Sequence, residues 1–181
     1  MSAPLRVAVY GPESTGKTTL AARLAGHFRA PLVAEYAREF WDAHGAIALS
    51  DIPVIAREQW RREDAAAAQA DRLIICDTEA LTTMLWSDLL YGSCPDEIRR
   101  GTEERATGYA LHLLLDIDVP FAPDPQRCFP DAEGRARCRH LWHEALESRG
   151  RPYRWIRGNW AERERAAIAA VEELLAQGGT R

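Results

Sequence analysis

Continuous apolar runs alternate with amphipathic segments along the chain. Runs at Leu5–Tyr10, 73–76 and 110–115 predict strands that are buried on both faces of a sheet. Shorter runs at 31–34 and Tyr153–Ile156 predict two further strands. Apolar residues recur at helical spacing in the segments between them, which are Lys17–Phe28, 35–44, 52–70, 78–90, 140–148 and 161–175. This alternation predicts an α/β fold with a central five-stranded parallel sheet and helices on both faces.

The composition is that of one globular domain. The chain has 181 residues, of which 46% are hydrophobic and 28% are charged, close to the average for globular proteins. We therefore expect a single domain over residues 1–181, with a loose tail from about residue 177. The 23 basic residues face 27 acidic ones, and the net charge of −4 supplies no positive field for nucleic acid.

The sequence carries no signal for export or for a membrane. No stretch approaches the roughly 18 consecutive apolar residues of a membrane span, and the first six residues lack the pattern of a signal peptide. No two cysteines form a CxxC pair, and Cys76 lies in an apolar run where a buried free thiol is expected. Cys128 and Cys138, with His140 and His143, match no common zinc-binding spacing. We expect a cytoplasmic protein with no disulfide framework, no nucleic-acid partner and no membrane partner.

Residues 11–18 read GPESTGKT and match the phosphate-loop pattern G-x4-G-K-[ST] between a predicted strand and a predicted helix. The glycines let the backbone wrap closely round a phosphate, and the N–H groups at the helix start attract the anion. Lys17 is the one lysine among the 23 basic residues, which marks a place where arginine does not suffice. The pattern predicts that Lys17 bridges the β- and γ-phosphates of ATP and that the Thr18 hydroxyl binds Mg²⁺. The predicted ATP-binding residues of this loop are Gly11, Glu13, Ser14, Thr15, Gly16, Lys17, Thr18 and Thr19.

Two carboxylates follow predicted strands. Asp77 ends the central strand, where a Walker-B type aspartate holds Mg²⁺ directly or through water; its alternative role is to cap the helix before Thr78. Glu35 follows the second strand and could take the proton of an acceptor hydroxyl that attacks the γ-phosphate. Its alternative role is to stabilise the first turn of a helix.

A long polar segment at 121–139 carries Arg127, Arg135, Arg137 and Arg139. Long loops inside compact domains are commonly lids. An arginine-rich lid suits a small-molecule kinase, because it neutralises the transferred phosphoryl group and excludes water. The alternative is a solvated arginine-rich surface.

Aromatic residues on the flanking helices could stack a flat ring on the acceptor side, although each alone is more often part of a core. They are Tyr36, Trp41, Trp60, Trp86 and Tyr91. Recognition of GTP usually needs an N/T-K-x-D segment. The only lysine in the sequence, Lys17, belongs to the phosphate loop, so the sequence contains no such segment. The pattern therefore argues against a standard GTPase.

Five sequence blocks carry a family resemblance: GPESTGKTTLAARLA, VAEYAREF, CDTEALTTMLWSDLLYG, DIDVPFAPDPQRCFPD and RGNWAERERAAI. Together they resemble the nicotinamide riboside kinases, in particular the kinase domain of bacterial bifunctional NAD-salvage enzymes. The resemblance implies a nucleoside-kinase-like P-loop fold. It also implies ATP-dependent phosphorylation of the 5′-hydroxyl of nicotinamide riboside to the mononucleotide in NAD salvage, with Mg²⁺ and with a small-molecule nucleoside as the partner.

The resemblance also implies roles for individual residues. The implied catalytic residues are Lys17, Glu35, Asp77 and Arg127, with Thr18 and Asp77 as metal ligands. The resemblance implies that Glu35, Arg38, Asp77, Asp124 and Arg127 bind the substrate, and the aromatic residues above add Tyr36, Trp86 and Tyr91 to the predicted substrate-binding residues. The implied contacts with ATP beyond the phosphate loop are Arg135 and, in a loop against adenine, Asn159, Trp160 and Arg163.

Two departures from the family pattern stand out. Pro125 and Gln126 follow Asp124 where the family often has glycine, which stiffens the backbone of the lid. The bifunctional relatives carry an HxGH-type adenylyltransferase motif, which this sequence lacks, and there is no room for a helix-turn-helix regulator domain. We expect a kinase without adenylyltransferase activity.

The hypothesis from the sequence is therefore a riboside kinase that transfers phosphate directly and in line. Glu35 is the first choice for the base and Asp77 for the metal, with Asp77 as the alternative base. Two other functions stay open: a kinase for another nucleoside or small hydroxyl metabolite, and a regulatory ATPase switch.

Overall fold

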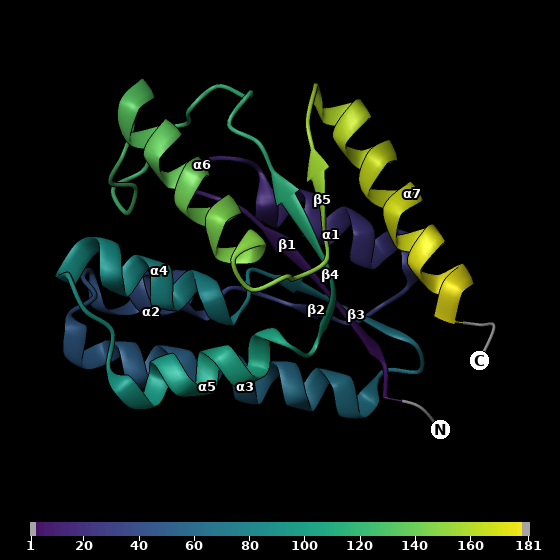
Figure 1. Ribbon diagram of the computed structural model, residues 1–181, viewed down its shortest axis with the longest axis horizontal. Coiled ribbons are helices and arrows are strands. Elements are labelled where there is room, and N and C mark those ends of the chain that lie inside the picture. The colour runs from purple at the N-terminus through teal and green to yellow at the C-terminus, as the bar shows by residue number, and fades with distance from the viewer. Residues whose placement is uncertain (1–2, 179–181) are drawn as a thin grey trace.

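Five parallel strands form the centre of the molecule. The computed structural model describes residues 3–178 (Figure 1). The strand order is β2-β3-β1-β4-β5, and every neighbouring pair runs parallel, as the sequence predicts. The strands are β1 (Leu5–Tyr10), β2 (Leu32–Val33), β3 (Leu73–Asp77), β4 (Tyr109–Leu115) and β5 (Tyr153–Ile156).

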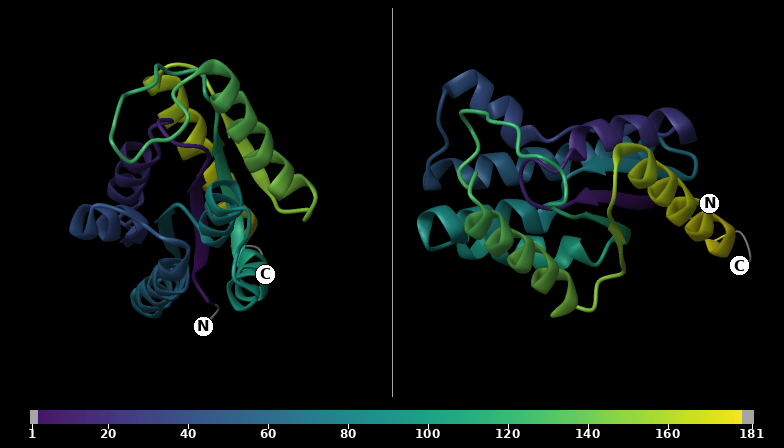
Figure 2. Two further views of the ribbon diagram at one scale, coloured as in Figure 1. Left: turned by 90° about the vertical axis from the view of Figure 1, so that its left-hand side faces the viewer. Right: turned by 90° about the horizontal axis from the view of Figure 1, so that it is seen from above.

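Helices cover both faces of this sheet (Figure 2). Two helices pack on one face, α1 (Lys17–Phe28) and α7 (Trp160–Gly178), and share a core with alternate residues of β1 and β4. The opposite face carries α3 (Ile52–Gln69), α4 (Ala80–Tyr91), α5 (Asp96–Ala106) and α6 (Ala132–Glu147). The short elements α2 (Tyr36–His44) and η1 (Leu49–Asp51) connect β2 to α3.

Alternation along β1 explains why the sheet is apolar throughout. Val7 and Val9 face α1 and α7, whereas Ala8 and Tyr10 face the other layer. All four side chains are fully buried. A strand covered on both faces needs apolar residues at every position, and hence it reads as a continuous run.

The start of α4 differs from the prediction. Thr78 has φ +78°, in the left-handed region, and so cannot be the first helical residue. The helix begins at Ala80, where the Glu79 carboxyl group caps it by accepting the Leu81 N–H at 2.9 Å. The alternative role of Asp77 as the cap of this helix is therefore wrong.

The predicted lid is only partly a loop. Asp131 accepts the Gly134 N–H at 2.8 Å and caps α6, which begins at Ala132. Arg135, Arg137 and Arg139 therefore lie on a helix. Arg127 alone of these arginines belongs to the irregular segment at residues 116–131, which is called the β4–α6 loop below.

Two other differences concern helix α5 and the C-terminus. The pattern of apolar residues did not predict helix α5, because its sequence is mostly polar and it buries only Ile98, Thr102 and Ala106. Helix α7 extends to Gly178, so the first part of the predicted tail is helical, and residues 179–181 lie outside the described residues.

All four cysteines are free thiols, and Cys76 is buried as predicted. None of the described helices is both long enough and apolar enough to cross a membrane.

Candidate active site

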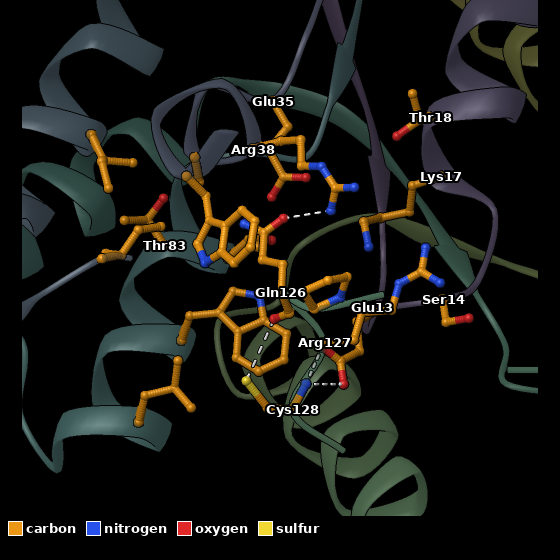
Figure 3. A pocket seen from close by; sticks show the side chains of 18 of the residues that line it. Glu13, Ser14, Lys17, Thr18, Glu35, Arg38, Thr83, Gln126, Arg127 and Cys128 are labelled. Atoms are coloured by element: carbon orange, nitrogen blue, oxygen red, sulfur yellow. Dashed lines mark hydrogen bonds between the residues drawn. The ribbon is translucent and has the colours of Figure 1, made fainter. Parts of the chain in front are cut away.

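A cavity of about 710 Å³ lies where the phosphate loop, helix α2, helix α4 and the β4–α6 loop meet (Figure 3). Twelve predicted site residues line it: Glu13, Ser14, Thr15, Gly16, Lys17, Thr18, Thr19, Glu35, Arg38, Trp86, Tyr91 and Arg127. The remaining predicted residues are not part of the lining: Gly11, Tyr36, Asp77, Asp124, Arg135, Asn159, Trp160 and Arg163. The cavity therefore gathers predicted residues from segments that are distant in the sequence.

The phosphate loop has a conformation that its glycines make possible. Gly11 has φ +144°, and a Cβ there would lie 2.9 Å from the Leu115 carbonyl oxygen. Gly16 has φ +84°, and a Cβ there would lie 2.4 Å from the Trp160 ring. The Lys17 ammonium donates to the Pro12 carbonyl at 2.8 Å, so the lysine folds back over its own loop.

Arg163 supports this loop from behind. Its side chain is 2% exposed and donates to the carbonyl oxygens of Thr15 at 3.0 Å and Asp116 at 2.8 Å. It also donates to Gly158 at 2.9 Å and forms an ion pair with Asp118. The guanidinium faces protein acceptors and not the cavity. Arg163 thus contacts the phosphate loop itself, and its predicted contact with ATP stays a prediction.

Two other predicted ATP contacts have structural partners. The Asn159 side chain accepts the Glu162 N–H at 3.0 Å while Glu162 accepts the Asn159 N–H at 2.8 Å, a reciprocal cap at the start of α7. Arg135 donates to the Val119 carbonyl at 2.9 Å. Trp160 is different, because it is 56% exposed and its ring lies against Gly16. Trp160 is therefore the residue of this group that offers a free ring surface beside the phosphate loop.

Side chains of the phosphate loop fasten the β4–α6 loop. The Glu13 carboxylate accepts the backbone N–H of Cys128 at 2.9 Å and of Phe129 at 2.6 Å. The Ser14 hydroxyl accepts the Ala122 N–H at 2.7 Å. Glu13 and Ser14 thus bind protein backbone through their side chains, in an arrangement that the sequence did not predict.

Arg38 makes a second attachment to the same loop. Its guanidinium donates to both oxygens of Asp124, at 3.1 and 2.5 Å. It also donates to the Gln126 side chain at 2.6 Å (Figure 3). Hydrogen bonds from Arg38 hold the pKa of Asp124 at about 2, below its ordinary value. The pair keeps the loop beside helix α2 and the cavity.

Asp77 lies at the end of the central strand with one oxygen unused. Its side chain is 2% exposed, and Oδ1 has no hydrogen-bond partner among the described residues. Burial raises the pKa of Asp77, and the Thr18 side chain and the Lys17 charge oppose this rise. A buried, unpaired carboxylate oxygen beside a threonine hydroxyl is a donor set that suits Mg²⁺. The residues present therefore fit the predicted metal.

Glu35 lies between the phosphate loop and helix α2. Burial raises the pKa of its carboxyl, and the Asp77 charge adds to this rise. The positive charges of Lys17 and Arg38 act in the opposite direction. Glu35 lines the cavity. The Glu35 carboxyl group therefore keeps its proton to a higher pH than an ordinary glutamate does.

A buried glutamine positions the start of α2. Gln59 is buried in α3, and its side-chain oxygen accepts the Tyr36 N–H at 2.8 Å, next to Glu35. Sequence reasoning missed this residue. The available signal was a polar residue on the inward stripe of α3, which buries Ile52, Ile55, Ala56, Gln59 and Glu63.

The side of the cavity away from the phosphate loop is aromatic and apolar. Trp41, Trp86 and Tyr91 line it, with apolar neighbours at Ile47, Ile52, Ile55 and Leu90. The other two aromatic candidates are occupied elsewhere. Tyr36 lies under Arg62, with 4.4 Å from the guanidinium carbon to the ring centre, and Trp60 packs against Gly101.

Comparisons with known proteins agree with this geometry. A family model described as an AAA domain matches residues 6–163. The trifunctional NAD biosynthesis/regulator protein NadR of Escherichia coli (strain K12) is 28% identical over 146 residues, which cover 78% of this chain and 35% of NadR. The chain thus spans about a third of that relative, and it is homologous to NadR at low identity, as the resemblance predicts.

Solved structures give the same fold. A crystal structure of NadR in complex with NR superposes with a TM-score of 0.76 at 24% identity, covering 96% of this chain and 52% of that one. A thymidylate kinase from Ehrlichia chaffeensis superposes with a TM-score of 0.65 at 15% identity, covering 96% and 100%. These similarities confirm the predicted P-loop NTPase fold of the nucleoside and nucleotide kinases.

Proposed function

The chain belongs to the AAA domain family, and from this premise we propose that it is an ATP-dependent kinase that phosphorylates the 5′-hydroxyl of nicotinamide riboside. The product of this reaction is nicotinamide mononucleotide. The homology to NadR, one structure of which contains NR, supports a riboside as the acceptor.

The observation that carries this proposal is the make-up of the cavity. The phosphate loop lines one side of it, aromatic residues line the other, and Glu35 lies between them with its pKa raised. Figure 3 shows Lys17 and Thr18 on the side opposite Thr83, with Glu35 and Arg38 between. A phosphate donor and a flat acceptor therefore fit side by side, with a carboxylate next to both.

The residues divide the chemistry among them. Lys17 neutralises the charge of the phosphates, and Arg127, which lines the cavity from the β4–α6 loop, stabilises the transferred group. Thr18 and the unpaired Asp77 oxygen would hold Mg²⁺, which would screen the phosphate charge. The exposed Trp160 ring supports the adenine base.

The transfer is a direct displacement. The acceptor oxygen forms a bond to the γ-phosphorus as the bond to the bridging oxygen of ADP breaks, and Glu35 accepts the hydroxyl proton. The β4–α6 loop excludes water because Glu13, Ser14 and Arg38 hold it in place.

A coupled assay of ADP release tests the proposal. Mg²⁺-ATP is supplied with nicotinamide riboside, with a panel of ordinary nucleosides, or with no acceptor, and the product is identified by mass spectrometry. We expect release that depends on nicotinamide riboside and yields the mononucleotide. If ADP release depends on a different nucleoside, that nucleoside is the acceptor. If no acceptor changes ADP release, the result favours a regulatory ATPase.

A further inference from the structure

Thr82 lines the cavity and has a buried hydroxyl that no described protein group bonds. It lies in the first turn of α4, is 2% exposed, lines the cavity, and its Oγ1 has no hydrogen-bond partner among the described residues. Among the described residues, Thr78 has the other buried hydroxyl without a partner, but Thr78 does not line the cavity. The buried hydroxyls of Thr15 and Ser87 donate to the carbonyl oxygens of Pro12 at 2.9 Å and Ser93 at 2.7 Å. A buried hydroxyl without a partner is costly, and here a bound molecule can supply the partner.

The neighbours of Thr82 indicate which part of a ligand reaches it. Trp86 follows four residues later on the same face of α4 and also lines the cavity. If a ligand ring packs against Trp86, one edge of that ring therefore lies near Thr82. The hydroxyl is suited to a polar substituent on that ring, because it can donate or accept a hydrogen bond.

Charge is distributed unevenly around the cavity. The cationic residues that line it are Lys17, Arg38 and Arg127, which come from the phosphate loop, α2 and the β4–α6 loop. Between residues 41 and 91, no lining residue that the structure describes carries a charge. A carboxylate on the ring would enter this region with no cationic side chain of the wall beside it, and burial of a carboxylate without a hydrogen-bonded partner is unfavourable.

We propose that Thr82 hydrogen-bonds an uncharged amide substituent on the acceptor ring, and that the surrounding uncharged wall selects against the corresponding carboxylate. This inference rests on the proposed function and adds the ring specificity of the same site. It distinguishes nicotinamide riboside from nicotinic acid riboside, whose rings differ only in an amide against a carboxylate.

Steady-state kinetics with three acceptors tests the inference. They are nicotinamide riboside, nicotinic acid riboside and the unsubstituted pyridine riboside. The wild-type protein should prefer the amide to the carboxylate by about 100-fold in kcat/KM. Thr82→Val should lower kcat/KM for nicotinamide riboside about tenfold, chiefly through KM, and leave the unsubstituted riboside within about twofold.

Two further variants separate this role from a structural one. Thr82→Ser keeps the hydroxyl and should stay within about threefold of the wild type for nicotinamide riboside. Thr102→Val is the matched control, because Thr102 is buried, donates to the Ala80 carbonyl and does not line the cavity. It should leave the preference among the three acceptors unchanged.

Three results would overturn the inference while leaving the kinase intact. They are equal use of the amide and the carboxylate by the wild type, no effect of Thr82→Val on nicotinamide riboside, and an equal loss on the unsubstituted riboside. An equal loss on the unsubstituted riboside would mean that the Thr82 hydroxyl contacts the ribose and not the ring substituent. Absence of turnover with every riboside would instead refute the proposed function, and the inference with it.

Discussion

Arg38 and Asp124, 86 positions apart in the chain, form a two-point ion pair in which both carboxylate oxygens accept N–H groups, at 3.1 and 2.5 Å. Arg38 belongs to α2, next to Glu35, and Asp124 belongs to the β4–α6 loop. The pair therefore links the position of the candidate base to the position of the loop. Planar, two-point pairing of this kind fixes geometry as well as charge.

Asp124→Asn should weaken that link. Asparagine offers one acceptor and no charge, so the loop loses its fixed position over the substrates. We expect kcat/KM for the acceptor to fall about tenfold, with a smaller effect on the KM for ATP. Glu173→Gln is the control, because it breaks an exposed pair with Arg154 on the far side of the sheet and should change neither constant.

Gly16→Ala should damage nucleotide binding without unfolding the protein. Gly16 has φ +84°, and its new Cβ would lie 2.4 Å from the Trp160 ring. The loop must move to relieve both strains, and kcat/KM for ATP should fall by on the order of 100-fold. Gly26→Ala, in the same helix region but with no atom within 4 Å of the new Cβ, should stabilise α1 by about 0.5–1 kcal/mol and leave ATP kinetics unchanged.

Arg163→Lys should reveal the support beneath the phosphate loop. Lysine cannot reach the four acceptors that the guanidinium contacts, and buried carbonyl groups would lose their partners. We expect a loss of about 3 kcal/mol in the free energy of unfolding, measured in urea, together with a raised KM for ATP. The exposed variant Arg154→Lys should change stability by less than about 0.5 kcal/mol. A normal stability for Arg163→Lys would contradict the assigned contacts.

Glu79→Gln should change how stability depends on pH. Burial raises the pKa of Glu79 to about 8 from an ordinary value of 4.5. The folded state thus binds this proton more tightly than the unfolded state, and its stabilising effect is complete below pH 4.5 and is lost as pH rises through 8. Glutamine keeps the cap on α4 without titrating. Urea unfolding at pH 5, 7 and 9 should show the variant gaining stability relative to the wild type as pH rises, whereas parallel curves would refute the assignment.

The fold was largely predictable because its signals are local. Strands β1 and β5 and helix α1 have the bounds that the apolar pattern predicts, since each is a short run that ends at glycine or at a change of periodicity. Helix α5 was missed because its three inward residues lie among eight that face outward or are partly covered. The periodicity of apolar residues predicts only helices that bury an apolar face, and α5 buries only three residues.

The site was predictable only where spacing in the sequence carries the chemistry. The phosphate loop has a fixed pattern, so its position follows from residues 11–18 alone. The contacts of Glu13 with Cys128 and of Gln59 with Tyr36 join residues 115 and 23 positions apart. No local pattern encodes such pairs, because they arise when β1, α3 and the β4–α6 loop converge at one edge of the sheet.

Glu35→Gln gives the sharpest test of the assigned chemistry. The Glu35 carboxylate must be ionised to accept the hydroxyl proton, and burial together with Asp77 raises its pKa. In the wild-type protein, kcat/KM should therefore fall as pH drops below this raised pKa. The variant should lose about 100-fold or more in kcat and should lack that acidic limb.

Asp77→Asn completes the comparison, because it separates the base from the metal ligand. Asp77 carries the unpaired buried oxygen beside Thr18, so its loss should raise the Mg²⁺ concentration needed for half-maximal rate while the acidic limb of Glu35 persists. In Glu35→Gln the Mg²⁺ requirement should stay near that of the wild type. A near-normal kcat in Glu35→Gln, with the acidic limb abolished in Asp77→Asn, would move the base role to Asp77.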